Sequence, residues 1–443
     1  MGQLIDARTA AARLGVDIRT LYAYVSRGAL RRVPGPDGRS SRYDADELDL
    51  LARRSRPRTL PRPGASIDLV IATQVSTVTD GLVRYRGTSV LDLVATGEPF
   101  EAVAARLWAD SGRAAHDPDA SAPADGLVGT GAAAVSSGAS ALSWVASPDP
   151  TAARIARALG DGVPVVQRFA AVVASMAGTG GAAADGQPLA PLSSGSSWAG
   201  WDWPAWGRAL IAALVEASGS PPGNGRAAGR PDEPGPGPGP GAAGLVAWRL
   251  WQCWSPLRPT PARTRALNTA LVLLAEHELA LSTLAVRVAA SARAAPSGCL
   301  LAGLGVLSGT LHGDAARLVQ ERLFGRAPAE RELGIGFGHS VHRHGDPRTA
   351  PLLDAVVAVA TPADRDLIER ARRDGPAPPN VDFALGALAH VARMPPEAAT
   401  GLFAVARTAG WIAHAAEEYT EPPLRFRGRA VVPGVRGEGA AWR

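Results

Sequence analysis

The sequence contains no lysine, so all 46 of its basic residues are arginines. Any contact with a phosphate group must therefore come from arginine, histidine, a hydroxyl group or the backbone. Only two cysteines, Cys253 and Cys299, occur in the 443 residues, and they lie far apart in the sequence. So few cysteines argue against a disulfide framework and are typical of a protein in a reducing cytoplasm.

Targeting and membrane signals are also lacking. The first residues, Met-Gly-Gln-Leu-Ile-Asp, do not have the charged and then apolar run of a signal peptide. No stretch of about 18 apolar residues predicts a membrane span. We therefore expect a cytoplasmic protein with no membrane partner.

Aromatic residues make up only 5% of the sequence, so the composition is dominated by smaller side chains such as Ala and Leu. Both favour helices, which predicts a mainly α fold, and the length is sufficient for two or three domains. The net charge of +5 is unevenly placed. The first 58 residues hold 12 Arg against 7 Asp or Glu, whereas the remainder holds 34 of each sign. The N-terminal segment is therefore expected to meet a polyanion.

Residues 1–58 have the pattern of a small helical domain. Gly15 suits a tight turn between two short helices, and the second helix is expected to begin near Asp17. Leu21 and Val25 are i,i+4 neighbours on one face of that second helix. The elements expected after it are a turn at 34–38, a basic hairpin at 39–43 and a helix at 45–54.

This order of helix, turn, helix, basic hairpin and helix resembles the winged helix-turn-helix of the MerR and excisionase type. The resemblance is carried by Ala10–Val16, Thr20–Val25, Arg27–Leu30 and Arg42-Tyr43. In that family the second helix enters the major groove and the hairpin touches the DNA backbone. The resemblance therefore implies duplex DNA as a partner, bound through Arg19, Thr20, Tyr22, Arg39 and Arg42. The alternative is a small appendage with solvated arginines, or a domain used only for packing.

A proline-containing linker is expected at 59–65, followed by a larger domain over 66–443. Ile67–Thr77 has a β-like pattern, and Gly81–Tyr85 could be its hairpin partner. Two segments of low complexity, Asp110–Ser140 and Ser218–Gly244, can bury little apolar surface. We interpret the second as a surface loop within the larger domain.

Four segments in the second half of the chain each contain a histidine or an aspartate that could take part in chemistry: 275–283, 309–313, 336–348 and 380–386. Each has a structural explanation by itself. His277 follows a leucine-rich helix face, as buried histidines often do, and Asp382 could merely cap a helix. His339, His342 and His344 could indicate a metal, but no fourth ligand has recognisable spacing. We therefore expect no metal site.

Together the four segments resemble the citrate synthase family. The segment 336–348 matches that family's pattern Gly-Phe-Gly-His-x-Val-x-Arg-x-x-Asp-Pro-Arg at every constrained position. Leu311-His312-Gly313 precedes it and Asn380–Phe383 follows it, in the family's order. Further matches are the hairpin at 79–88 and the segment Leu402–His414. The resemblance runs from about Ile67 to Gly434, with a gap between about Asp110 and Trp251.

The resemblance implies a role for three side chains that suits the chemistry of condensing an acyl-CoA with a 2-oxo acid. A methyl group beside a thioester is a very weak acid, so its deprotonation needs a base and stabilisation of the enol oxygen. Asp382 would be the base, and His312 would donate a hydrogen bond to the thioester oxygen. His339 would polarise the carbonyl of the 2-oxo acid and protonate it.

The same resemblance implies substrate contacts. Arginine suits a dicarboxylate such as oxaloacetate because its planar fork binds carboxylates in bidentate fashion. The implied pocket is lined by His277, Arg348, Arg407 and, from the partner subunit, Arg425. Arg427 is the alternative to Arg425. The implied contacts with CoA come from Gly336, Phe337, Gly338 and Arg343.

The family fold is almost all α-helical, so the whole chain is expected to be a two-domain helical citrate synthase fold preceded by a winged helix-turn-helix. The large domain would comprise 66–312 and 396–443, and the small domain 313–395. The resemblance implies a homodimer that converts acetyl-CoA and oxaloacetate to citrate, with the CoA thioester as a substrate and no cofactor. The alternatives are a 2-methylcitrate synthase that uses propionyl-CoA and a DNA-binding regulator whose synthase-like domain senses a metabolite.

Overall fold

The computed structural model describes residues 4–14, 18, 21–22, 25, 30–35, 41–45, 48, 69–79, 81–109, 150–160, 162–176, 201–219, 245–325, 334–339, 341–342 and 345–428. The chain divides into two compact units, Met1–Ile71 and Ala72–Arg443. The expected linker at 59–65 lies outside the described residues, as does nearly all of the two low-complexity segments.

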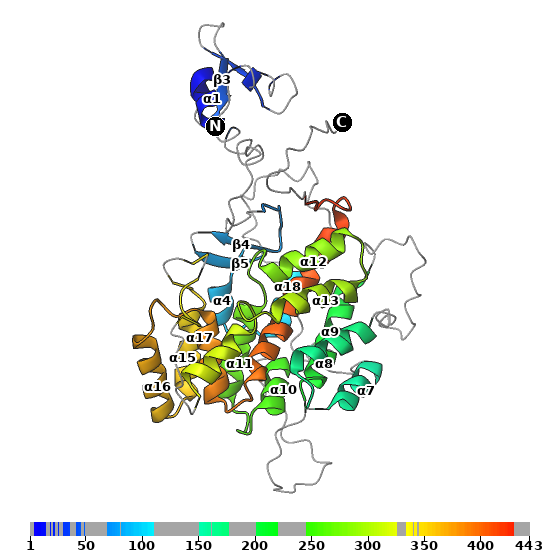
Figure 1. The fold of residues 1–443 in the computed structure, drawn as a ribbon, viewed down its shortest axis with the longest axis vertical. Coiled ribbons are helices and arrows are strands. Elements are labelled where there is room, and N and C mark those ends of the chain that lie inside the picture. The colour runs from blue at the N-terminus through cyan, green and yellow to red at the C-terminus, as the bar shows by residue number, and fades with distance from the viewer. Residues whose placement is uncertain are drawn as a thin grey trace, which may run out of the picture. The chain divides into compact units, whose positions relative to one another are not determined.

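The N-terminal unit has a small core under a three-stranded sheet (Figure 1). Its described elements are β1 (Leu4–Asp6), α1 (Ala7–Leu14), β2 (Val33–Pro34) and β3 (Ser41–Asp44). β3 lies between the other two strands and is antiparallel to both. The Asp6 carboxylate accepts the backbone N–H groups of Arg8 and Thr9, which starts α1. The described positions between 18 and 25 are helical, and Leu21 is fully buried with Tyr43.

The larger unit begins with an antiparallel sheet and continues as helices, which confirms the expected mainly α fold. The strands are β4 (Ser76–Thr79), β5 (Leu82–Tyr85) and β6 (Thr88–Ser89). The described helices are α4 (Val90–Ala95), α5 (Phe100–Trp108), α7 (Pro150–Leu159), α8 (Val165–Ser175), α9 (Trp203–Glu216), α10 (Leu245–Trp254), α11 (Pro261–Leu274), α12 (Leu281–Ser291), α13 (Pro296–Leu307), α14 (Ala315–Leu323), α15 (Thr349–Val359), α16 (Pro362–Arg373), α17 (Val381–Val391) and α18 (Glu397–Thr420).

The predicted hairpin is confirmed, but its first strand was placed too early. Residues 69–75 contain no strand, and pairing begins at Ser76, opposite Tyr85. In the run Ile67–Thr77 only Ser76 and Thr77 pair with another strand, so the β-like pattern before Ser76 reflects apolar and β-branched side chains alone. The register is instead set by the turn at Gly81, which has a φ of 77°.

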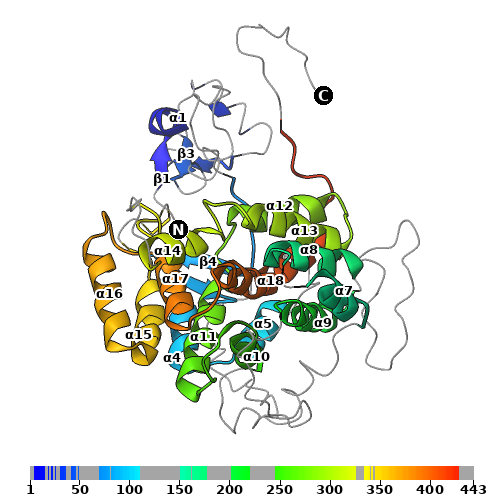
Figure 2. The same ribbon diagram turned by 60° about the horizontal axis from the view of Figure 1, so that its bottom comes forward.

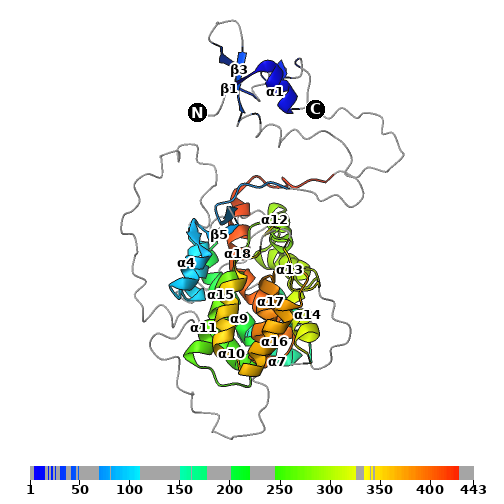
Figure 3. The same cartoon turned by 90° about the vertical axis from the view of Figure 1, so that its left-hand side faces the viewer.

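The helix α18 forms the centre of the larger unit. Every residue from Ala398 to Tyr419 is buried, as expected for a helix with neighbours on all sides. Figure 2 shows α14–α17 on one side of α18 and α7–α9 on the other, and Figure 3 shows α15, α16 and α17 packed together with α14. No described helix is long and apolar enough to cross a membrane.

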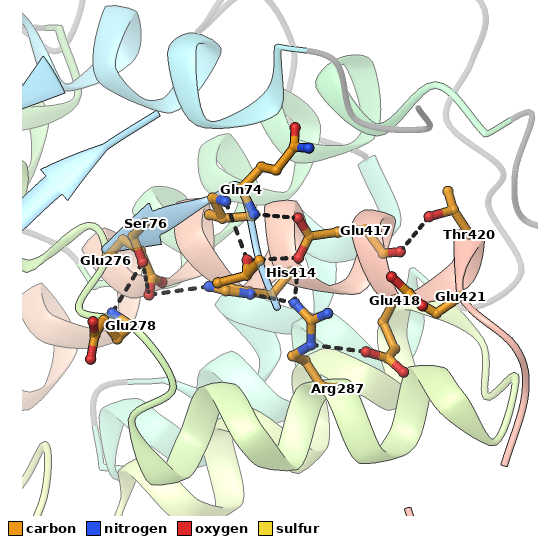
Figure 4. A network of polar contacts seen from close by, with 12 residues as sticks. Gln74, Ser76, Glu276, Glu278, Arg287, His414, Glu417, Glu418, Thr420 and Glu421 are labelled. Carbon is orange, nitrogen blue, oxygen red and sulfur yellow. Dashed lines mark hydrogen bonds and ion pairs between the residues drawn. The ribbon is translucent and has the colours of Figure 1, made fainter. Parts of the chain in front are cut away.

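A buried network of charged groups ties α12 and α18 to the strand β4 (Figure 4). The guanidinium of Arg287 is fully buried and donates to Glu417 at 2.6 Å and to Glu418 at 2.8 Å. It also donates to Nδ1 of His414 at 2.8 Å. Arginine has no acceptor, so Nδ1 of His414 must hold a lone pair and its ring hydrogen is on Nε2. That Nε2 lies 3.2 Å from the Glu276 carboxylate.

The network continues from Arg287 in two directions, to Glu276 through His414 and to Arg425 through Glu418. Burial raises the pKa of Glu276, but His414 and Arg407 outweigh it and hold that pKa below its usual value. The hydroxyl of Ser76 donates to the same carboxylate at 3.2 Å. At the other end, Arg425 pairs with Glu418 at 2.6 Å. Because Glu276 directly precedes His277, the network fixes the backbone from which that histidine projects.

We predict that Arg287→Met lowers the free energy of unfolding of the larger unit by roughly 3–5 kcal/mol, because it leaves two buried carboxylates without their shared cation. Chemical denaturation followed by tryptophan fluorescence would measure this. All 11 tryptophans lie beyond residue 72, so the signal reports on this unit.

Arg372→Met is the matched control. Arg372 pairs with Glu369 at 2.8 Å, but both side chains are more than half exposed. Its loss should change the free energy of unfolding by less than about 1 kcal/mol. Equal effects of the two substitutions would show that the Arg287 network does not hold the fold together.

Candidate active site

Five connected parts of the larger unit contribute polar side chains to one site. His277 lies between α11 and α12, and His312 lies in the turn before α14. His339 belongs to the loop before α15, Asp382 to the first turn of α17, and Arg407 to the middle of α18. The charge of Arg407 acts on the pKa of His277, His312 and Asp382, so the site joins residues that are up to 130 positions apart in the sequence.

Three histidine rings lie close together in this site. The ring centroids of His277 and His339 are 5.3 Å apart, those of His277 and His342 are 5.1 Å apart, and those of His339 and His342 are 4.8 Å apart. Burial and neighbouring arginines lower the pKa of His277 well below its usual value. The described residues contain no group of three or more His, Cys, Asp or Glu that could hold a metal ion.

The tautomer of His339 follows from its hydrogen bonds. Its Nδ1 accepts the backbone N–H groups of Val341 at 3.1 Å and His342 at 3.2 Å. A nitrogen that accepts two hydrogens carries none itself, so the ring hydrogen is on Nε2. Nη2 of Arg348 lies 3.5 Å from that Nε2, which is longer than an ordinary hydrogen bond and does not compete with the two contacts at Nδ1. Burial and the charge of Arg348 lower the pKa of His339 to about 4. The ring is therefore neutral near pH 7 and presents an N–H donor.

Arg348 is almost fully buried and is held by Asp346. The guanidinium donates through Nε at 2.9 Å and Nη2 at 2.8 Å, and the backbone N–H of Arg348 also donates to this carboxylate. Asp346 accepts a further N–H, from Val381 at the start of α17. Although burial raises the pKa of Asp346, Arg348 holds it below its usual value. The pair fixes one face of Arg348 and ties it to α17.

Arg407 is 1% exposed and is only partly satisfied. Its Nε donates to the carbonyl of Leu274 at 2.9 Å, and its guanidinium lies 4.9 Å from the ring centroid of Phe403. Its Nη1 is buried and has no hydrogen-bond partner among the described residues. Such an atom is costly unless a ligand accepts its hydrogens. Burial lowers the pKa of this group.

Asp382 sits in the first turn of α17, which Asn380 caps. The Asn380 side chain accepts the backbone N–H groups of Asp382 and Phe383 at 3.0 and 3.2 Å. The Oδ1 of Asp382 is buried with no partner in the described part of the chain. Burial raises the pKa of Asp382 to about 6, against the opposing effects of Arg348 and Arg407. A raised pKa makes this carboxylate a stronger base than an exposed one.

His312 is positioned by Ser282. Its Nε2 lies 2.8 Å from the Ser282 hydroxyl, which also accepts a long hydrogen bond from Trp411 Nε1 at 3.4 Å. The tryptophan can only donate, which leaves the hydroxyl hydrogen of Ser282 free to point to Nε2 of His312. In that arrangement the ring hydrogen of His312 is on Nδ1. Burial lowers the pKa of His312 to about 4. The His312 ring also packs against Phe403, which links it to Arg407.

The glycine-rich loop at 336–338 is fixed to the start of α17. Gly336 and Gly338 have φ values of 84° and 69°, a region that favours glycine. The carbonyl of Gly336 accepts the backbone N–H of Asn380, and the Asn380 amide donates to the carbonyl of Gly338. The ring of Phe337 packs against Phe383, with centroids 5.3 Å apart.

The structure does not bring all implied residues to this site. Arg425 pairs with Glu418 of its own chain, and its guanidinium lies 5.1 Å from the Phe426 ring centroid. Arg343 lies outside the described residues.

In the N-terminal unit, Arg42 donates to the carbonyl of Leu4, and Tyr22 is 49% exposed. The remaining implied DNA contacts, Arg19, Thr20 and Arg39, lie outside the described residues.

Sequence reasoning assigned no role to Ser282, Asp346, Asn380 or His342. All four lie inside the quoted segments, so the signal was present, but their partners are distant in the sequence. Ser282 needs His312 beside it, and Asp346 needs Val381. Only the folded chain reveals these pairs.

Residues 238–427 match the family model described as the citrate synthase, C-terminal domain. Citrate synthase 2 of Bacillus subtilis is 32% identical over 199 residues, which are 40% of this chain and 52% of that protein. 2-Methylcitrate synthase 2 of Corynebacterium glutamicum is 30% identical over 185 residues, which are 37% of this chain and 48% of that protein. The chain thus spans about half the length of the curated relatives it matches.

Solved structures extend the similarity of fold. Citrate synthase from Thermoplasma acidophilum, solved as a ternary complex with carboxymethyl coenzyme A and oxaloacetate, superimposes with a TM-score of 0.58 at 19% identity and covers 84% of this chain and 96% of that one. Citrate synthase from Pyrobaculum aerophilum gives a TM-score of 0.58 at 21% identity, with 84% and 92% covered. The chain therefore has the helical citrate synthase fold, and residues 238–427 match the model of that family's C-terminal domain.

Proposed function

We propose that the larger unit condenses acetyl-CoA with oxaloacetate to give citrate and CoA. One observation carries the proposal: a buried, unpartnered carboxylate oxygen of Asp382 shares a site with a buried, unpartnered arginine nitrogen of Arg407. Two unsatisfied groups of opposite charge in one place indicate a site that receives a weakly acidic C–H bond at Asp382 and a carboxylate at Arg407.

The first step of the proposed reaction is enolisation. Asp382 takes a proton from the methyl carbon of the acyl group, and the C–H electrons form the enol double bond. The thioester oxygen then gains electron density, and the Nδ1–H of His312 donates a hydrogen bond to it. One such donor is typically worth roughly 2.7–4 kcal/mol of transition-state stabilisation.

The second step is attack by the enol carbon on the ketone carbon of oxaloacetate. The ketone oxygen takes the hydrogen from Nε2 of His339 and becomes a hydroxyl group. Arg348 and Arg407 hold the two carboxylates of the oxo acid. Water then adds its hydroxyl group to the thioester carbon as the carbon–sulfur bond breaks, and its hydrogen goes to the sulfur of CoA. Asp382 releases its proton to solvent and His339 regains one from solvent, so both groups return to their starting state as citrate and CoA leave. The proposed contacts with CoA are those of 336–338 and Arg343, and the CoA thioester is a substrate, so no cofactor is required.

Two related reactions of this type differ in the length of the acyl chain that is condensed. The relatives include a protein named citrate synthase and one named 2-methylcitrate synthase. That second name favours propionyl-CoA as the alternative substrate, with the same base and the same oxo acid. We propose acetyl-CoA as the main substrate and a cytoplasmic location.

We also propose a homodimer. The helix α13 contains no charged residue, yet Leu301 and Val306 on it are only partly buried. Leu281 and Val288, on the neighbouring helix α12, are 68% and 45% exposed. A second copy covering these side chains would remove an apolar surface from water. Arg425 lies next to α12, because its backbone N–H donates to the hydroxyl of Ser291 at the end of that helix. In the proposed dimer Arg425 contributes to the partner's oxo-acid pocket.

We predict that Asp382→Asn lowers kcat by roughly 10²-fold or more, since the amide cannot accept the methyl proton. In the wild-type protein, kcat/KM should fall about tenfold per pH unit below about pH 6, where protonation of Asp382 removes the base. The pKa values of His312 and His339 lie near 4, so this acid limb belongs to Asp382.

CoA release measured with a thiol reagent tests both statements. Asp366→Asn, at an exposed position of α16, is the control and should keep the wild-type rate and pH profile. Turnover by Asp382→Asn within about threefold of wild type would remove Asp382 from the mechanism.

For the N-terminal unit we propose binding of duplex DNA. The support is the excess of positive charge in residues 1–58 and the hairpin of β2 and β3, on which Arg42 lies. Tyr22 is exposed beside the buried Leu21, as a groove-facing side chain would be. Proposed contacts are Arg19, Thr20, Tyr22, Arg39 and Arg42. A dimer of the larger unit would supply two copies and favour a palindromic site.

We predict that the logarithm of the DNA affinity falls linearly with the logarithm of the salt concentration, by about 0.9 per phosphate contacted. Arg42→Ala should reduce that slope by about 1, and Arg372→Ala on α16 should leave it unchanged. Mobility shifts of the full chain with DNA from its own upstream region provide the measurement. Absence of a salt-sensitive shift would mean that this unit is an appendage.

A further inference from the structure

His342 forms a contact that the proposed reaction does not use. Its Nε2 lies 2.8 Å from Nε2 of His277, a hydrogen-bond distance between two imidazoles. His342 is 4% exposed and His277 is 7% exposed. Burial lowers the pKa of both rings, so neither is charged near pH 7. One ring must therefore donate its single hydrogen and the other must accept it.

The direction of this hydrogen bond follows from the far side of His342. Its Nδ1 is buried and has no partner among the described residues. If His342 accepted at Nε2, its Nδ1 would carry a buried hydrogen with no acceptor. If His342 donates at Nε2, its Nδ1 holds only a lone pair. Orphaned buried N–H groups are rarer than unsatisfied acceptors, which favours His342 as the donor.

The charged groups around His342 do not oppose this direction. Asp346 and Arg348 are the charges that act on it, and they form an ion pair with each other. The backbone N–H of His342 donates to Nδ1 of His339, which fixes the backbone from which the His342 ring projects. The orientation of the ring is thus set by the loop and by His277.

We infer that His342 is a positioning residue that sets the tautomer of His277. Donation from His342 makes Nε2 of His277 an acceptor, so the hydrogen of His277 is on Nδ1. That Nδ1 makes no hydrogen bond with the described residues, but unlike Nδ1 of His342 it is not a fully buried atom, so its hydrogen can meet a ligand. The inference rests on the proposed function only for the identity of the ligand.

A donor at this place suits an anionic oxo acid. After burial, the largest influences on the pKa of His277 are the charges of Arg348 and Arg407, the two groups proposed to hold the carboxylates, followed by His339 and His342. A lone pair on His277 facing a carboxylate would repel it, whereas an N–H attracts it. His342 therefore acts on the binding of the oxo acid and not on proton transfer, so its loss should change KM more than kcat.

Two substitutions separate the hydrogen bond from packing. His342→Leu removes the donor and keeps a buried side chain, and His342→Gln keeps an N–H donor. We expect His342→Leu to raise the KM for oxaloacetate by about tenfold, with kcat within about threefold, as for loss of a hydrogen bond to a charged group. His342→Gln should restore most of the affinity.

The direct readout is the tautomer of His277 in the full chain, measured by ¹⁵N NMR of ring nitrogens with His277 assigned by its absence in His277→Gln. The inference predicts a hydrogen on Nδ1 in the wild type and a mixture of tautomers in His342→Leu. A hydrogen on Nε2 in the wild type, or an unchanged tautomer in His342→Leu, would overturn it. Failure of wild-type protein to release CoA would overturn the proposed reaction instead, because the NMR result does not depend on turnover.

Discussion

The carboxylate of Asp346 holds the proposed active site together. It accepts two hydrogen bonds from the guanidinium of Arg348, one from the Arg348 backbone and one from the Val381 backbone. The contacts with Arg348 join the loop that carries His339 and His342 to α15. The contact with Val381 joins both to α17, which carries Asp382. A buried ion pair adds little net stability, but it specifies one arrangement of the groups around it. In this chain it places a cation and a base at a fixed separation.

Buried polar groups serve two purposes in the larger unit. Around Arg287 the carboxylates of Glu417 and Glu418 are satisfied by several donors, and the network stabilises the packing of α12 against α18. Around α17, Asp382 and Arg407 each keep an unpartnered atom, as Arg287 and Glu276 do in the network, but the pKa of Asp382 is raised whereas that of Glu276 is lowered. The second arrangement costs stability until a ligand binds, which is the usual physical sign of a binding site.

The sequence predicted the parts of the site whose chemistry lies in contiguous motifs. His312, His339 and Asp382 are in the segments that resemble citrate synthase, and the charge of Arg348 or Arg407 acts on the pKa of each. Pairs that join distant residues were not predictable, as with Arg287 and His414, because side-chain spacing carries no information about contacts across 127 positions. The β-like run before Ser76 misled for a related reason, since strand pairing depends on the partner strand and on the turn at Gly81.

The central claim is that two buried arginines and a histidine donor form a pocket for a dicarboxylic 2-oxo acid. Isothermal titration calorimetry of the full chain with oxaloacetate tests it directly. Pyruvate is the matched ligand, because it has the same 2-oxo acid group without the second carboxylate. We predict that oxaloacetate binds with a stoichiometry of about one per chain and at least about tenfold more tightly than pyruvate, as expected when an arginine loses its carboxylate partner. Equal affinities, or no detectable binding of oxaloacetate, would contradict the account.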